Sequence, residues 1–407
     1  MARLLAAVLL TTTAGEAALL PQWANGGTRA GPLSRGQAVA LALAQGPDLA
    51  EALPLIAQAK AAVRGAGEWP NPNLGFSIGP DDPTIYGTID QRFPVFGQRG
   101  TAVRAAQAEA LVSALEYQAR VLQVRVGVQR AYTALALAQA ELGLAGEAAG
   151  LERDVAQRTR AKANDGLAPE LDAQLAELAA ARAQQTVRDW EARVVQARLA
   201  LVQLCGLPLA TPLATGESLG LPPLPAVTAE HPKLQAAELD TAAAAARVDR
   251  ERAAARPTPT LSLQLERLPP PLDRSAGASL GVRGGITVDL PVLSQNGGAV
   301  ARERAGQTLA DAHLRAVRTR LASGQESARA RFEAAVARAR FNREQAVPAA
   351  QHVTDLARSA YDLGRTPLIA LLQVLSDLNR SRAASIEAMA EAWDAREDLE
   401  EVTGAMP

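Results

Sequence analysis

The feature that most constrains this sequence is an internal duplication. Gly166 in AKANDGLAPELDAQ corresponds to Gly364 in AYDLGRTPLIALLQ, and the two glycines lie 198 residues apart. Gly206 in LVQLCG corresponds to Gly404 in LEEVTG at the same offset of 198. Self-similarity at a fixed offset indicates two copies of one structural plan. Any proposed fold must therefore be built twice from the same elements.

Each copy predicts the same order of elements: a helix, a proline-rich break, two strands joined by a turn, a Pro-Val break, a very long helix, a glycine turn and a second long helix. The first predicted repeat spans 19–215, with a β-hairpin at 73–93 and a helical turn at 164–169; the second spans 216–407, with a β-hairpin at 260–290 and a helical turn at 362–367. The second hairpin also contains an insertion, which a turn between strands tolerates.

The long helices follow from proline spacing and hydrophobic periodicity. No proline lies between Pro94 and Pro169, so one helix of about 65 residues and about 100 Å is allowed there. Apolar residues recur in this segment at alternating spacings of three and four, which is typical of a coiled-coil seam: Val121, Val124, Val128, Ala131, Leu135, Ala138, Leu142 and Ala145. In the second repeat Pro348 interrupts the matching segment, and we expect a kink or break there.

The strands alternate in polarity. Leu74, Phe76 and Ile78 fall on one face of the first strand, as expected for a wall between lipid and water. Four strands cannot close into a barrel, and an open sheet edge is not tolerated in hydrocarbon. A membrane barrel built from this chain therefore requires several copies. The alternative is that the hairpins are soluble caps on a helical stalk.

Composition favours helices that pack through small side chains. Hydrophobic residues make up 48% of the chain but aromatic residues only 3%, so alanine and leucine supply most of the apolar content. The 42 basic residues nearly cancel the 43 acidic ones, giving a net charge of -1, and the two signs are interspersed. This pattern argues against a nucleic-acid partner.

The N-terminus has the pattern of a secretory signal peptide. A short basic start is followed by LLAAVLL and then by the small residues of TTTAGEAA, and we predict a signal peptide at 1–18. The alternative is a frayed amphipathic helix. No other segment offers about 18 uncharged apolar residues, so the sequence predicts no helical membrane span.

No reactive constellation stands out in the sequence. His231, His313 and His352 lie far apart without partners at metal-ligand spacing, and the single cysteine, Cys205, excludes a disulfide framework. GVRGG at 281–285 lacks the lysine of a phosphate-binding loop and lies within a predicted strand. We therefore expect no enzyme, no cofactor and no metal site.

The sequence resembles the TolC-like outer-membrane factors over nearly all of the mature chain. The resemblance is carried by the duplicated Pro-x-Pro entries to the strands, by the exits FPVFGQRG and LPVLSQNGG into long helices, and by the paired glycine turns. It implies a mainly α fold with a small β part. As a homotrimer, four strands per chain complete a 12-stranded β-barrel, and long antiparallel coiled-coil helices complete a 12-helix α-barrel.

The same resemblance implies a passive channel in the outer membrane of a Gram-negative bacterium, in contact with outer-membrane lipid and extending into the periplasm. Its implied partners are a periplasmic adaptor and an inner-membrane pump of the resistance-nodulation-division type. Two alternatives stay open. One is the outer-membrane channel of a type I protein secretion system, and the other is a non-conducting coiled-coil protein of the periplasm or surface.

The turns between the long helices are the candidate functional sites. GLAPELD resembles the family's adaptor-docking tip, which implies adaptor contacts at Gly166, Leu167 and Asp172, with Gly364 in the corresponding second turn. Independently of the resemblance, Gly166 supplies the positive φ that ends a helix, Pro169 begins the next helix, and Leu167 offers an exposed apolar contact.

The second turn resembles the family's pore gate. Tyr361 occupies the position of a gate tyrosine, and Arg365 lies beside the usual gate arginine. Where the family often has aspartates, this chain has Ala370 and Gln373, so a carboxylate ring would have to use Asp377, one turn further along.

The strand exits VFGQRG and PVLSQNGG resemble those of the heavy-metal branch of the family, which carries cobalt, zinc and cadmium. This similarity implies metal cations as cargo. Gln98 and Gly297 depart from the pattern of that branch, and drug efflux is the alternative cargo.

Overall fold

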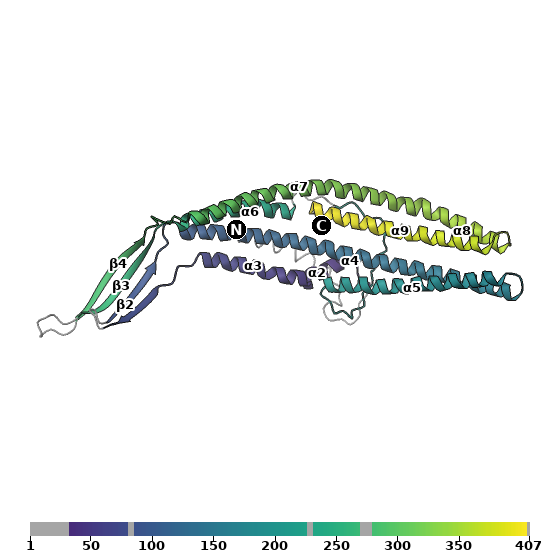
Figure 1. Ribbon diagram of the computed structural model, residues 1–407, viewed down its shortest axis with the longest axis horizontal. Coiled ribbons are helices and arrows are strands. Elements are labelled where there is room, and N and C mark those ends of the chain that lie inside the picture. The colour runs from purple at the N-terminus through teal and green to yellow at the C-terminus, as the bar shows by residue number, and fades with distance from the viewer. Residues whose placement is uncertain (1–31, 80–84, 226–230, 269–278, 405–407) are drawn as a thin grey trace. The chain divides into compact units, whose positions relative to one another are not determined.

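The computed structural model describes residues 32–79, 85–225, 231–268 and 279–404. The predicted signal peptide at 1–18 and the tips of both predicted β-hairpins lie outside these residues. The elements, in chain order, are α2 (Arg35–Gln45), α3 (Pro47–Ala66), β1 (Asn73–Ile78), β2 (Ile85–Arg92), α4 (Gln98–Asn164), α5 (Glu170–Leu204), α6 (Pro232–Ala254), β3 (Thr258–Leu268), β4 (Ser279–Asp289), α7 (Gly297–Phe341), a π-helical turn η3 (Asn342–Ala346), α8 (Val347–Asp362) and α9 (Leu368–Thr403) (Figure 1).

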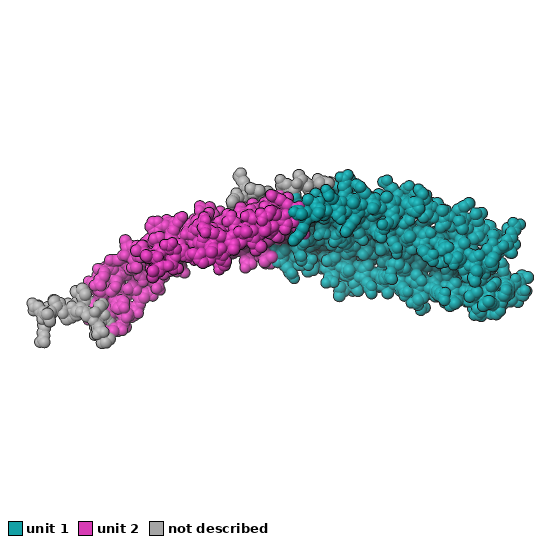
Figure 2. Space-filling view, turned by 45° about the horizontal axis from the view of Figure 1, so that its top comes forward, with its two compact units in different colours: residues 1–52, 118–232, 319–407 teal, residues 53–117, 233–318 magenta. Residues whose placement is uncertain are grey.

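The chain forms two compact units, and each unit takes segments from both halves of the sequence (Figure 2). Unit 1 draws its described residues from Met1–Ala52, Gln118–Pro232 and Thr319–Pro407. Unit 2 draws its described residues from Leu53–Tyr117 and Lys233–Arg318, and it contains the four strands. The predicted fold class, mainly α with a small four-stranded β part, is confirmed.

The longest predicted helix is present as α4, which runs without interruption for 67 residues. Its predicted seam faces inward: Val128 and Leu135 are fully buried, and Val121, Val124 and Ala138 are nearly so. Burial of this stripe, rather than the weak helix propensity of its valines, accounts for a helix of this length.

The expected break at Pro348 takes a milder form. Proline has no backbone N–H to donate to the residue four positions earlier, and its ring would collide with that carbonyl in a regular helix. The structure places the π-helical turn Asn342–Ala346 directly upstream, and the amide of Val347 donates to the carbonyl of Asn342 five residues before it. The wider turn accommodates the proline, and α8 follows α7 through η3.

Positive φ angles in the described residues occur in three pairs at nearly the same offset. One pair is Gly166 and Gly364, a second is Gly206 and Gly404, and the third is Gly97 with Asn296, which has a φ of 55°. Asparagine is among the few residues other than glycine that adopt this region readily. The backbone at Asn296 thus matches that at Gly97, although the sequences differ.

Gly206 and Gly404 also lack room for a side chain. A Cβ at Gly206 would lie 2.3 Å from the carbonyl oxygen of Gln45, and a Cβ at Gly404 would lie 3.2 Å from His231. Each glycine therefore lets the end of a long helix approach the start of a helix that begins with proline.

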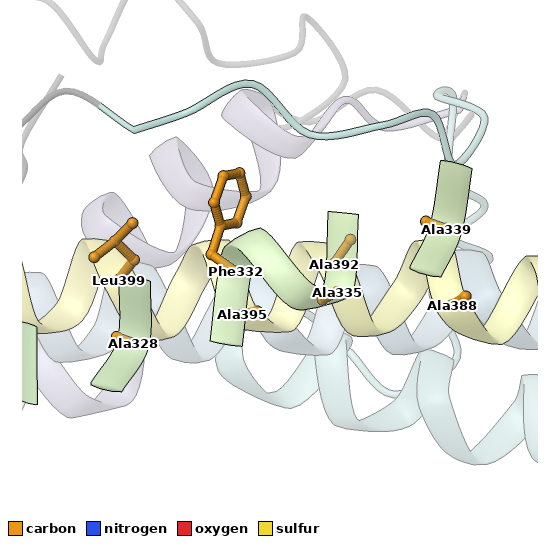
Figure 3. Close-up of a cluster of buried hydrophobic side chains, with 8 residues drawn as sticks. All are labelled: Ala328, Phe332, Ala335, Ala339, Ala388, Ala392, Ala395 and Leu399. Atoms are coloured by element: carbon orange, nitrogen blue, oxygen red, sulfur yellow. The ribbon is translucent and has the colours of Figure 1, made fainter. Parts of the chain in front are cut away.

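Small side chains form the seam between α7 and α9 in unit 1 (Figure 3). The α7 side contributes Ala328, Phe332, Ala335 and Ala339, and the α9 side contributes Ala388, Ala392, Ala395 and Leu399. Both sets follow spacings of four, three and four, as in a coiled coil. Six of the eight residues are alanine, so the two helices can pack closely, and Phe332 supplies the one aromatic ring of the cluster.

A buried polar network joins α2, α4 and α9 within unit 1. Arg35 pairs through Nη1 with Oε1 of Glu397, and the same nitrogen donates to Thr133 Oγ1 at 2.9 Å. Thr133 in turn donates to Glu397 Oε1 at 3.0 Å. The guanidinium carbon of Arg35 lies 3.9 Å from the ring centroid of Trp393. Glu397 is completely buried, and burial raises its pKa to about 7 against the opposing charge of Arg35.

We predict that Glu397→Ala lowers the free energy of unfolding by about 3–5 kcal/mol, because it leaves the Arg35 guanidinium buried without its counter-charge. Replacing both partners by apolar residues, Arg35→Met with Glu397→Leu, should recover most of that loss. The measurement is urea unfolding of the purified protein, followed by its helical circular dichroism.

The matched control is Arg329→Ala, which breaks an exposed pair between Arg329 and Glu333 four residues apart. This change should cost less than about 0.5 kcal/mol. If Glu397→Ala were as stable as the control variant, the network would not hold the three helices together.

Candidate functional site

The turns α4–α5 and α8–α9 have the same backbone. In the first, the amide of Gly166 donates to Ala163 at 3.0 Å and the amide of Leu167 donates to Lys162 at 2.7 Å. In the second, the corresponding donors are Gly364 to Tyr361 at 3.0 Å and Arg365 to Ala360 at 2.8 Å. Each glycine has a φ near 70°, and this pattern ends a helix by satisfying its last carbonyl groups.

The following helices also begin alike. Pro169 and Pro367 are the capping residues of α5 and α9, both in extended conformation. Their carbonyl groups accept from the amides of Asp172 and Ala370, in each case at 3.1 Å. The two turns therefore differ in side chains rather than in backbone.

Apolar side chains at both turns are exposed. Leu167 is 78% exposed, and Leu171, in the first turn of α5, is 67% exposed. Leu363 and Ile369 at the other turn are exposed to a similar degree. The prediction from the sequence named Leu167 alone; the others could have been found from the apolar residues that flank each Gly-x-x-Pro.

The first turn is braced by Arg160 of α4, which pairs with Glu170 at 2.6 Å and with Glu177 at 2.7 Å on α5. The hydrogen bond from Arg160 lowers the pKa of Glu177 below its usual range. Asp172, also in the first turn of α5, is half-buried. The brace leaves the apolar side chain of Leu167 free to contact a partner.

Tyr361 ties the second turn to the first within one chain. Its hydroxyl lies 3.2 Å from Thr159 Oγ1 of α4, and Lys162 Nζ lies 4.7 Å from the centre of its ring. Tyr361 also packs against a buried cluster that joins α4, α5 and α9, formed by Ala156, Ala176 and Leu368. The prediction from the sequence identified the tyrosine but not these partners, because they lie about 200 residues away along the chain.

The remaining gate candidates lie along one side of α9. Gln373 and Asp377 are exposed, and the Gln373 amide donates to Asp377 at 3.4 Å. Arg380 donates to the same carboxylate at 2.9 Å. Ala370 is half-exposed on the same face, while Arg365 is exposed in the turn. Asp377 is therefore the carboxylate of this group, and Arg380 is the cation beside it that the sequence did not suggest.

In unit 2 the four strands form one antiparallel sheet in the order β1-β2-β3-β4 (Figure 1). Directly paired residues lie on the same face, so the register defines two surfaces. One surface is apolar and exposed, with the paired rows Leu74, Ile89, Leu263, Gly284 and Phe76, Gly87, Leu265, Val282. The opposite surface is polar, with the paired rows Gly75, Thr88, Gln264, Arg283 and Ser77, Tyr86, Glu266, Gly281.

The sheet is open at both edges, since neither β1 nor β4 has an outer partner among the described strands. Among the residues that the structure describes, no single helix is long and apolar enough to cross a membrane. The bent pair α2 and α3 meets that test by length and composition. The described residues also contain no group of three histidine, cysteine, aspartate or glutamate side chains placed to hold a metal ion.

A family model described as outer membrane efflux protein matches residues 38–207 and 224–405. The chain belongs to the outer membrane efflux protein family. The two matched segments each contain one helical turn and one pair of strands. Membership places the protein in the outer membrane of a Gram-negative bacterium, in a family of efflux channels rather than enzymes.

Solved structures share the fold of this outer membrane efflux protein at low sequence identity. VceC from Vibrio cholerae has 19% identity and a TM-score of 0.73, covering 91% of this chain and 96% of its own. The open state of MtrE from Neisseria gonorrhoeae has 17% identity and a TM-score of 0.68, covering 91% and 88%. CmeC from Campylobacter jejuni has 14% identity and a TM-score of 0.74, covering 91% and 85%. No curated protein matches the chain by sequence.

Proposed function

We propose that the protein acts as a homotrimeric passive conduit of a tripartite efflux system. The observation that carries this proposal is the sheet of unit 2, which has one exposed apolar face, one polar face and two open edges. An apolar outer face against lipid and a polar inner face against water are what a channel wall requires. The sheet thus favours a conducting wall over the alternative of a non-conducting coiled-coil protein.

The open edges support assembly with other copies. Every backbone N–H and C=O in hydrocarbon must have a partner, so β4 of one chain would pair with β1 of the next. Three copies give a 12-stranded barrel. The helices also expose apolar side chains away from the turns: α5 exposes Leu178 and Val195, and α8 exposes Val353 and Leu356. These side chains would be buried between neighbouring copies in a 12-helix α-barrel.

The two turns have separate proposed roles. The first turn, with Gly166, Leu167 and Asp172, would dock a periplasmic adaptor through its exposed apolar residues, with Gly364 shaping the equivalent second turn. The second turn would act as the gate. Its opening requires the contact between Tyr361 and Thr159 to break, so that Arg365 and the Ala370–Asp377 side of α9 move outward.

The protein supplies no energy in this proposal; an inner-membrane pump of the resistance-nodulation-division type does. We propose heavy-metal cations as cargo, a choice supported by the resemblance of the strand exits VFGQRG and PVLSQNGG to that branch, from which Gln98 and Gly297 depart. Drug efflux and type I protein secretion are the competing outcomes. We further propose that 1–18 is removed as a signal peptide, and that 19–215 and 216–407 are the two repeats.

In planar lipid bilayers we expect the purified protein to form trimers that conduct ions. Tyr361→Phe should raise the open probability about 2- to 10-fold, because it removes one hydrogen bond to Thr159 while keeping the ring in place. Single-channel recording is the measurement. Thr159→Val should have the same effect, and the double variant no greater one. A soluble product that conducts nothing would overturn the proposed function.

In cells that lack the gene, we expect growth to be inhibited by zinc, cobalt, cadmium and copper at lower concentrations, and the intact gene to restore resistance. Leu167→Asp should abolish this rescue, because a charged side chain at the tip opposes an apolar adaptor contact. Leu224→Asp, an equally exposed leucine in a loop away from the tips, is the control. Unchanged metal resistance with increased drug sensitivity would contradict the metal assignment and favour drug cargo.

A further inference from the structure

Unit 1 contains a recess of about 340 Å³ between α4, α5 and α9. Its walls are mainly apolar and include Leu144, Ala148 and Ala383, with the ring of Trp190 on the α5 side. This volume is at the lower end of the range for sites that hold small organic molecules. None of the site residues predicted from the sequence lines the recess.

Three carboxylates border the recess. Glu141 and Glu152 come from α4, and Glu387 comes from α9. Burial raises the pKa of Glu141, and the nearby charge of Glu387 raises it further. Burial also raises the pKa of Glu152. At both carboxyl groups the surroundings therefore disfavour the ionised form.

Glu141 is the central group. It is only 3% exposed, and its Oε1 atom has no hydrogen-bond partner in the described structure. A buried carboxylate oxygen without a partner is costly, and native structures rarely retain one without a reason. The charge of Arg193 lowers the pKa of Glu141 and so offsets part of the effect of burial, but no hydrogen bond joins Arg193 to Oε1. Arg193 lies 4.4 Å from the Trp190 ring centroid, and Arg380 pairs with Asp377 at 2.9 Å.

The recess is bordered by the side of α9 that carries the proposed gate residues. Gln373, Asp377, Arg380 and Glu387 follow one another at helical spacing along that helix, and the last two line the recess. This step rests on the proposed function: if the Gln373–Asp377 side faces the lumen, so does the recess. A molecule that travels along the channel would then meet Glu141.

The chemistry of the recess selects its ligand. The apolar walls and the Trp190 ring suit a hydrocarbon group, and the partnerless acceptor of Glu141 suits an N–H donor that carries positive charge. A metal ion is a poor fit, because the described residues include no group of three ligands placed to hold one. An anion would be repelled by three carboxylates.

We propose that the recess bounded by Glu141 and Trp190 is a binding site for organic ammonium ions that carry an apolar group. The ammonium donates to Glu141 Oε1, and the apolar group packs between Trp190 and the alanine-rich walls. The site forms within one chain, so a trimer holds three of them.

The test is isothermal titration calorimetry of the full chain in detergent, with 2-phenylethylammonium as the probe. We expect one site per chain. The uncharged 2-phenylethanol and the Glu141→Gln variant should each bind at least about tenfold more weakly, because a charge-assisted hydrogen bond is lost. Glu147→Gln, which changes an exposed carboxylate on the same helix outside the recess, should bind as the unmodified protein does.

Three results would overturn the site: no binding of the ammonium probe, equal binding of 3-phenylpropanoate, or unchanged binding by Glu141→Gln. Zinc binding that is lost in Glu141→Gln would overturn the organic assignment. If Glu141→Gln fails to fold, Trp190→Ala should weaken binding instead, and unchanged binding by that variant would overturn the site. Bilayer recordings on the same preparation separate the two proposals. Conduction without binding would overturn only the proposed binding site, and binding without conduction would overturn only the proposed channel function.

Discussion

The structure depends on a requirement of the β-strand backbone: each strand has hydrogen-bonding groups on both edges, and hydrocarbon supplies no partner for them. Two hairpins join through β2 and β3 into a single sheet, and this leaves only β1 and β4 with open edges. Within one chain these two edges cannot meet around four strands. The sheet therefore has a face compatible with lipid, and closing it into the proposed barrel would require further copies of the chain.

The helices meet a different requirement, that of packing closely over long distances. Alanine seams such as Ala335 against Ala392 permit close approach, and glycine or asparagine with positive φ ends or precedes the helices at defined points. Because both repeats have residues with positive φ at these positions, the two helical turns have the same backbone conformation. Different side chains on that common backbone, Leu167 in one turn and Arg365 in the other, allow different roles.

Local pattern was enough to predict the strands, the length of α4 and the two turns. The ends of the predicted hairpins, 73–93 and 260–290, lie within two residues of the observed strand ends. The interruption predicted at Pro348 is present as the π-helical turn η3, a form that proline spacing alone does not specify. The network of Arg35 with Glu397 and the partnerless Glu141 could not be predicted, since each depends on which helices pack together across hundreds of residues.

If the sheet separates lipid from water, its two faces should differ in their reaction with reagents dissolved in the water. Site-directed cysteine labelling of trimers in lipid vesicles measures this difference. The native Cys205 is buried, and burial raises its pKa to about 12, so it contributes little background. Thr88→Cys on the polar face should react with a charged, membrane-impermeant maleimide. Phe76→Cys on the apolar face should react only after the vesicles are dissolved and the protein is unfolded. Equal labelling of both positions in intact vesicles would contradict the account.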